Sequence, residues 1–168
     1  AGTPRRGTWG GLAGAVDLVG GEGDQAPAAG SVFGSRSTPS TNALGHVAFE
    51  GILATGSGGV TGTNDSGLWI ADQTGSEVLQ IVREGQPLNG STIVEIDFAG
   101  GSGGQDGRRS GLNDEGQVAY TAHLANGVDL LQLFTPTLHW RPLTDGSWDN
   151  RFNWTLGTRP SAVHDVLI

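Results

Sequence analysis

The sequence predicts an all-β protein, with little or no helix and with antiparallel sheets. Of its 168 residues, 30 are Gly and 7 are Pro. Either residue costs about 1–3 kcal/mol inside a helix, and together they interrupt nearly every window long enough for three helical turns. Short apolar runs separated by clusters of Gly, Asn, Asp and Ser fill most of the chain, which is typical of strands joined by turns.

Each apolar run predicts one strand. In chain order, the predicted strands are 12–19, a short one at 31–34, 46–54, 67–72, 77–83, 92–98, 117–124, 128–134, 137–143 and 163–168. The alternation is clearest in two places. From Val47 to Leu53 the odd-numbered residues share one face, and from Val118 to Leu124 the even-numbered residues do. This period of two predicts antiparallel sheets with one wetter side.

One motif occurs twice. Asn42 to Phe49 (NALGHVAF) and Asn113 to Tyr120 (NDEGQVAY) both follow the pattern N-x-x-G-x-V-A-aromatic. Asn bonds nearby backbone and Gly supplies a positive φ, so the motif predicts a turn that leads into a strand. The motif therefore predicts how the chain folds and does not predict a catalytic or binding site.

The recurrence predicts two four-stranded units, at about 12–74 and 77–134, within a β domain of residues 12–134. The units would pack as propeller-like blades or as a sandwich. Residues 1–11 are expected to be an extended N-terminal segment. Residues 135–168 are expected to be a Trp-rich C-terminal segment that ends in a strand.

Three short blocks occur in the order found in a known kind of protein: Gly67-Leu68-Trp69-Ile70-Ala71-Asp72, Arg83-Glu84-Gly85 and the second N-x-x-G motif. Residues 18–134 thus resemble bacterial extracellular proteins with tandem N-x-x-G-x-V-A-F repeats. Tyr120 replaces the usual Phe, and Val128-Asp129-Leu130-Leu131 stands where Gly-Leu-Trp is expected. The resemblance implies an extracellular repeat domain and no defined activity.

The C-terminal segment carries Trp140, Trp148 and Trp154 and closes with Asp165-Val166-Leu167-Ile168. It resembles the Trp-rich segments that open β-solenoid or autotransporter-like repeats in secreted bacterial proteins.

The composition excludes several kinds of chemistry. The chain has no Cys, all nine of its basic residues are Arg, and its net charge is −8. Thiolate catalysis, Schiff-base catalysis and a P-loop Lys are therefore excluded. The negative charge argues against nucleic acid as a partner, and no apolar run approaches the ~20 residues of a membrane span. Ala1 in place of Met predicts a secreted or cell-surface protein, mature after signal-peptide removal.

No catalytic residue is predicted, and the protein is not expected to be an enzyme. The sequence has no G-x-S-x-G and no H-E-x-x-H motif. Glu50, Glu95 and Asp97 lie on predicted strands. They are expected to form an ordinary acidic surface, and the alternative is a pair of carboxylates that hydrolyses glycosidic bonds. His46 and His123 occupy similar places on the two strands into which the motif leads. They are either ligands of a shared metal site or hydrogen-bonded strand residues without a metal.

Calcium is the one metal that the sequence suggests, and no other cofactor is expected. Its oxygen ligands would come from turns. The candidates are Asp65, Asp106, Asp145 and Asp149, with solvated turn residues as the alternative. None of the turns matches an EF-hand loop.

We expect a structural protein that pairs with other copies of itself. Neither a blade pair nor a sandwich closes its sheet edges, and the sequence has no Lys to protect them. The terminal segments are therefore expected to pair between subunits into a fibre, sheath or surface assembly. The alternative is a monomeric secreted module that binds carbohydrate, such as a polysaccharide, or protein. For Trp148 and Trp154, burial against Pro160 and the last strand is a further alternative. The predicted interface residues are Trp9, Trp148, Trp154, Val163, Val166, Leu167 and Ile168.

Overall fold

The computed structural model confirms the all-β class. It describes residues 7–10, 17–27, 29–37, 39–100, 110–141 and 145–168. Within these ranges strands predominate, and the helical part is limited to two 3-10 turns, η1 (Arg151–Asn153) and η2 (Thr155–Gly157). No helix in the described ranges is both long enough and apolar enough to cross a membrane.

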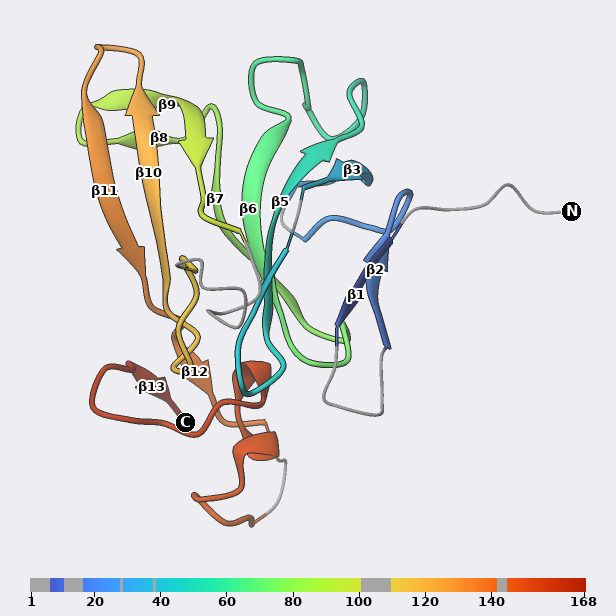
Figure 1. The fold of residues 1–168 in the computed structure, drawn as a ribbon, viewed down its shortest axis with the longest axis vertical. Helices are drawn as coiled ribbons and strands as arrows, with labels where there is room; N and C mark the ends of the chain where they lie inside the picture. Colours follow the sequence, from blue (N-terminus) through green and yellow to red (C-terminus); the bar gives the residue numbers. More distant parts are fainter. Residues whose placement is uncertain (1–6, 11–16, 28, 38, 101–109, 142–144) are drawn as a thin grey trace, which may run out of the picture.

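The first sheet contains the first N-x-x-G motif. Its strand order is β3-β5-β6-β7, all antiparallel, and the short β4 also pairs with β5. The strands are β3 (Phe33–Arg36), β4 (Ser40–Thr41), β5 (Val47–Leu53), β6 (Ser66–Ala71) and β7 (Val78–Arg83). In Figure 1 they form the central part of the molecule.

The second sheet contains the second motif and has the strand order β11-β10-β9-β8. Its strands are β8 (Pro87–Leu88), β9 (Ser91–Asp97), β10 (Val118–Leu124) and β11 (Asp129–Phe134). Two smaller pairs complete the fold. An antiparallel pair joins β1 (Gly7–Gly10) to β2 (Asp17–Gly21), and a parallel pair joins β12 (Leu138–His139) to β13 (Val166–Leu167).

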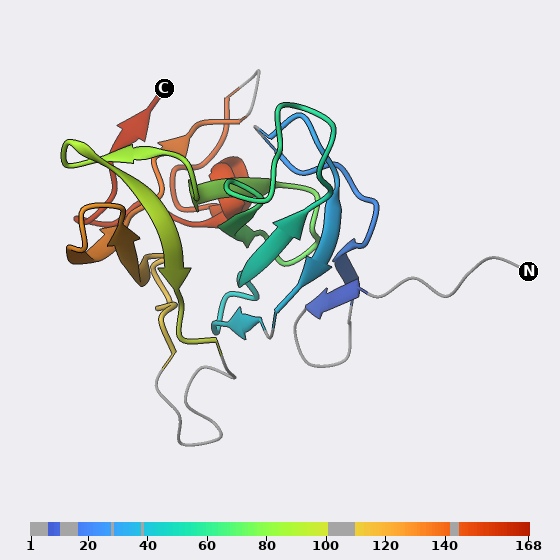
Figure 2. The same cartoon turned by 90° about the horizontal axis from the view of Figure 1, so that it is seen from above.

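The first sheet is a middle layer with a core on each face. Leu68 and Ile70 of β6 pack into the core shared with the second sheet, whereas Trp69 packs into a core with Phe33 and Phe49. Both sides of β6 are therefore buried, unlike the one wetter side that the alternation predicts. Seen from above, the first sheet lies between the second sheet and the β1–β2 pair (Figure 2).

The sheets do not coincide with the two predicted units. The strand at 77–83, assigned to the second unit, is β7 and pairs with β6 in the first sheet. A short turn explains this pairing: Asp72 N donates to Glu77 O, and Gly75 N donates to Asp72 O. Strands joined by so short a turn pair with each other.

The terminal strands have partners inside the chain, whereas the terminal segments were expected to pair between subunits. Residues 7–10, expected to be merely extended, form β1 and pair with β2, and β13 pairs with β12. Within the predicted strands at 137–143 and 163–168, the described residues form strands only at Leu138–His139 and Val166–Leu167, and residues 142–143 lie outside the described residues. Part of the predicted strand at 12–19 lies outside the described residues.

The two N-x-x-G motifs form the same turn, as their sequences predict. Asn42 Oδ1 accepts hydrogen bonds from the backbone N–H groups two and four residues later, and Asn113 Oδ1 does the same. Gly45 and Gly116 have φ values of 84° and 75°. The turns also contact each other, because Asn42 Nδ2 donates to Asn113 O (2.8 Å).

Candidate functional site

Strand β11 is an edge of the second sheet, and among the described strands only β10 pairs with it. Leu124 N donates to Val128 O (2.9 Å), which sets the hydrogen-bonded positions of the β10–β11 pair. Hydrogen-bonded and non-bonded positions alternate along an antiparallel pair. The backbone N–H and C=O groups of Asp129, Leu131 and Leu133 therefore point away from β10, toward the open edge.

The side chains on this edge are mostly apolar and exposed. Leu131 is 80% exposed and Leu133 is 62% exposed, and Asp129 is the single charged residue of the strand. Proteins usually protect an open edge with Lys, Pro, a bulge or a very short strand. β11 has six residues and none of these protections, so it has the features of a strand-pairing surface.

The other described edge strands differ from β11. β8 has two residues and β3 has four. β7 has six, but its apolar side chains are buried or half-buried. β11 is thus the edge, within the described part of the chain, that combines length with exposed leucines.

His123 lies on the outer face of the same sheet, between two carboxylates. Its Nδ1 is 2.7 Å from Asp129 Oδ1 on β11, and its Nε2 is 3.0 Å from Asp97 Oδ2 on β9. Hydrogen bonds to Asp97 and to Asp129 hold the pKa of His123 above its usual range. The side chains of three adjacent strands are joined in this way. We call Asp97, His123 and Asp129 the histidine bridge.

His46 is not part of a site shared with His123. It is fully buried, and Asn42 Nδ2 donates to its Nδ1 (2.9 Å). The ring proton is therefore on Nε2, which donates to Leu156 O (2.9 Å). Burial lowers the pKa of His46. His46 thus attaches the C-terminal segment to the first motif.

A cleft of about 550 Å³ lies between the two sheets, and four carboxyl side chains line it: Glu50, Asp65, Glu84 and Glu95. Burial is the main cause of a raised pKa in both Glu50 and Glu84. The predicted carboxylates Glu50 and Glu95 thus share a cleft, whereas Asp97 belongs to the histidine bridge.

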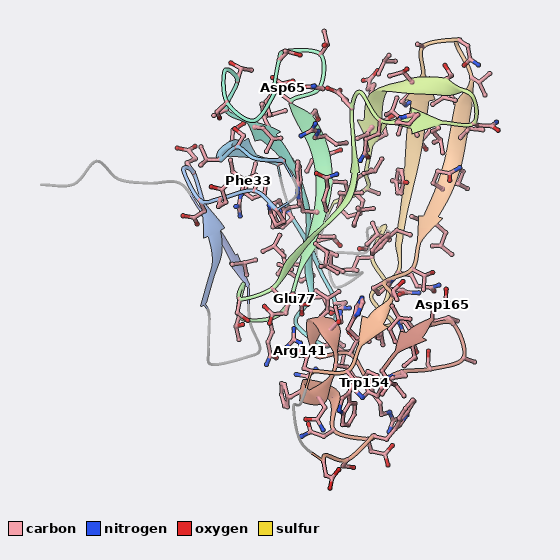
Figure 3. All side chains as sticks on the ribbon, turned by 180° about the vertical axis from the view of Figure 1, so that it is seen from behind. Phe33, Asp65, Glu77, Arg141, Trp154 and Asp165 are labelled. Atoms are coloured by element: carbon pink, nitrogen blue, oxygen red, sulfur yellow. The ribbon has the colours of Figure 1, made fainter. Side chains whose placement is uncertain are left out.

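The predicted calcium ligands are not brought together. Asp65 lies in the cleft at one end of the molecule (Figure 3), while Asp149 is 3.6 Å from Arg159 Nη1 in the C-terminal segment. Asp145 is exposed, and Asp106 lies outside the described residues. Within the ranges that the structure describes, no three His, Asp or Glu side chains are arranged to hold a metal ion.

The C-terminal segment packs against the first sheet through polar contacts. Glu77 forms an ion pair with Arg141, and the two lie side by side in Figure 3. Glu77 Oε2 also accepts from Leu156 N (2.6 Å). A second cavity, of about 450 Å³, lies where this segment meets the two motif turns. Its charged groups have partners within the protein, such as Arg151 with Leu44 O (3.3 Å).

The predicted interface residues have different environments. Trp154 is fully buried between Trp140 and Trp148, with ring centroids 4.8 and 4.6 Å away, so its side chain offers no surface to a second copy. Its Nε1 donates to Trp148 O (3.0 Å). Trp148 is exposed, and the side chain of Trp9 lies outside the described residues. In the last strand Val166 is half-buried, whereas Val163, Leu167 and Ile168 are exposed.

Sequence reasoning missed Leu131 and Leu133. The signal was available, because residues 130–134 (LLQLF) are apolar at odd and even positions alike. In a strand with one buried face, this pattern leaves apolar side chains in solvent.

Residues 1–129 match the model of a family of unknown function, DUF7453. The chain belongs to this family. The residues that match DUF7453 include both N-x-x-G turns and end at Asp129, the first residue of β11. No curated protein and no solved structure matches the chain.

Proposed function

We propose that this protein is a structural subunit that assembles with other copies of itself by pairing the open edge of β11. The proposal includes an extracellular setting, in a fibre, sheath or surface layer. The observation that carries it is the six-residue β11 edge with Leu131 and Leu133 in solvent. Neither an enzymatic reaction nor a cofactor is part of the proposal.

A second copy is a suitable partner for this edge because the strand is self-complementary. When two β11 strands pair antiparallel about a two-fold axis at Leu131, each Leu131 lies opposite its equivalent. Asp129 then lies opposite Leu133 of the other copy. At each position the outward N–H and C=O groups face one another and exchange two hydrogen bonds. The leucines form one apolar patch across the joint.

A fibre requires a second contact, since one two-fold contact stops at a pair. The exposed apolar side chains of Val163, Leu167 and Ile168 are the surface that we assign to it. The extracellular setting is supported by the resemblance of the motif blocks to those of bacterial extracellular repeat proteins, and the net charge of −8 favours a partner other than nucleic acid.

Leu131→Lys tests the joint. The substitution puts two ammonium groups opposite each other at its centre and removes the largest exposed leucine surface, so we expect association to fall at least about tenfold. Sedimentation velocity over a range of protein concentrations measures it.

Val94→Lys is the matched control. Val94 is also an exposed aliphatic residue, 50% exposed, but it lies on β9, at an irregularity of the β9–β10 register and away from the β11 edge. The control makes the same change of charge and should associate as the unaltered protein does. Equal effects of the two substitutions, or an unaltered protein that is monomeric throughout, would rule the proposal out.

The second candidate function is binding of carbohydrate or protein by a monomer. It is favoured by one observation: Trp148 and Phe152 in the C-terminal segment are 49% and 57% exposed, and exposed aromatic rings stack on sugars. Retention of the monomer by insoluble polysaccharides, with loss on Trp148→Ala, would support this function.

A further inference from the structure

We propose that the protonation of His123 controls the β11 edge, so that copies associate at neutral pH and separate as the solution becomes alkaline. This inference rests on the proposed function, because it concerns the same edge. It follows from the geometry of the histidine bridge.

Both ring nitrogens of His123 lie at hydrogen-bond distance from a carboxylate oxygen, 2.7 Å for Asp129 and 3.0 Å for Asp97. A carboxylate only accepts hydrogen bonds, and a neutral imidazole has a single N–H. In the neutral ring, one nitrogen lone pair would face a carboxylate oxygen. Both contacts are satisfied only in the imidazolium form, so the observed geometry is that of the protonated state.

The charged groups around His123 link its protonation state to the charge beside the β11 edge. On β9, Asp97 bonds to the ring, and Glu95 lies directly opposite His123 in the strand register. On β11, Asp129 bonds to the ring. Among the groups that the structure describes here, the imidazolium is the positive charge between the carboxylates of Asp97 and Asp129. When His123 loses its proton, the positive charge between these two carboxylates is lost.

Loss of the proton from His123 has two effects on β11. The neutral ring has a single N–H and can donate to only one of Asp97 and Asp129, so the side-chain link across β9, β10 and β11 is incomplete and the edge strand is held less firmly. In addition, the same face of each copy lies beside the joint in the proposed pair, and the unbalanced negative charges of the two copies repel. Both effects weaken association as the pH rises.

The direction of the pKa shift of His123 agrees with weaker association at higher pH. The two carboxylates raise the pKa of His123 above 6.5, so the bridge is fully present below pH 6.5 and is lost as the pH rises through the pKa of the folded protein. Association is therefore expected to fall as the pH is raised from 6.5 to 9.0, and carboxylates with ordinary pKa values stay ionised throughout this range.

The experiment compares three proteins by sedimentation velocity at pH 6.5 and 9.0, at constant ionic strength. We expect the association constant of the unaltered protein to fall about threefold to tenfold between the two values. His123→Gln cannot titrate and should show no such fall, with association close to the alkaline value at both pH values. His123→Arg keeps a positive charge and should remain associated at pH 9.0.

The outcomes separate this inference from the proposed function. If the unaltered protein associates through β11 but its association does not change with pH, or if His123→Gln keeps the full pH dependence, the control by His123 is wrong and the assembly stands. If the unaltered protein is monomeric at both pH values, both proposals are wrong. The other three histidines are present in every variant, so their titration is a constant background.

Discussion

Leu156 shows how single residues fix the C-terminal segment. It has a positive φ of 58° and is 1% exposed, a strained conformation for a residue with a bulky side chain. Both of its backbone polar groups are held by residues that directly precede strands of the first sheet: its N–H donates to Glu77, before β7, and its C=O accepts from His46, before β5. Two fixed hydrogen bonds and burial together keep the residue in this conformation.

His46 predicts a pH dependence of stability. Burial lowers its pKa below 6.5, so its contribution to stability is present above pH 6.5 and is lost as the pH falls from 6.5 toward the pKa of the folded protein. We expect the free energy of unfolding to fall by up to about 1 kcal/mol between pH 6.5 and 5.5. Urea unfolding at the two pH values measures this change. His46→Gln should remove it, and an unchanged dependence in that variant would assign it to other groups.

The N-x-x-G turn was predictable from the sequence because its interactions are local. The Asn side chain bonds to backbone within four residues, and Gly supplies the positive φ. The alternating faces of β5 and β10 were predictable for the same reason, since the strand period fixes them.

Local interactions of this kind did not predict which strands pair with each other. The assignment of 77–83 to the second unit failed because strand pairing is decided by the turn at 72–77 and not by the distance to a motif.

Substitution of Gly45 and Gly116 tests how much each N-x-x-G turn contributes to stability. Ala at either position must adopt a positive φ, which costs about 1–2 kcal/mol. At Gly45 the new Cβ would also lie 2.8 Å from Gln73 Cβ, whereas at Gly116 the nearest atom, His46 Nδ1, is 3.4 Å away. Gly45→Ala should therefore lower the melting temperature more than Gly116→Ala does. Equal losses would show that the turn conformation alone decides the cost.

At the scale of the whole molecule, the sequence could not show that the terminal strands are paired internally. β12 and β13 are 27 or more residues apart and pair in parallel, which no local pattern signals. Their pairing follows from how the C-terminal segment docks. Contacts of Glu77, Gln73 and Leu44 with that segment bring the two strands together. The assembly surface therefore moves, in our proposal, from the chain ends to β11.

Glu77→Ala tests this docking. The substitution removes the ion pair with Arg141 and leaves Leu156 N without its acceptor, which we expect to cost about 2 kcal/mol. Limited proteolysis should then cut the C-terminal segment faster.

Glu115→Ala is the control for this test. Glu115 also contacts the segment, through Ser161 Oγ at 2.8 Å, but that hydrogen bond is exposed, so the loss should be much smaller. If both variants resist proteolysis as the unaltered protein does, the polar contacts are not what holds the segment.

The middle position of the first sheet has a thermodynamic consequence. One core joins side chains of both sheets to Leu156 of the C-terminal segment, and the other covers the opposite face of the same strands. If β6 separated, both cores would be opened to water at once. The layers cannot melt one after another, and heating should show a single cooperative transition with no stable half-folded intermediate.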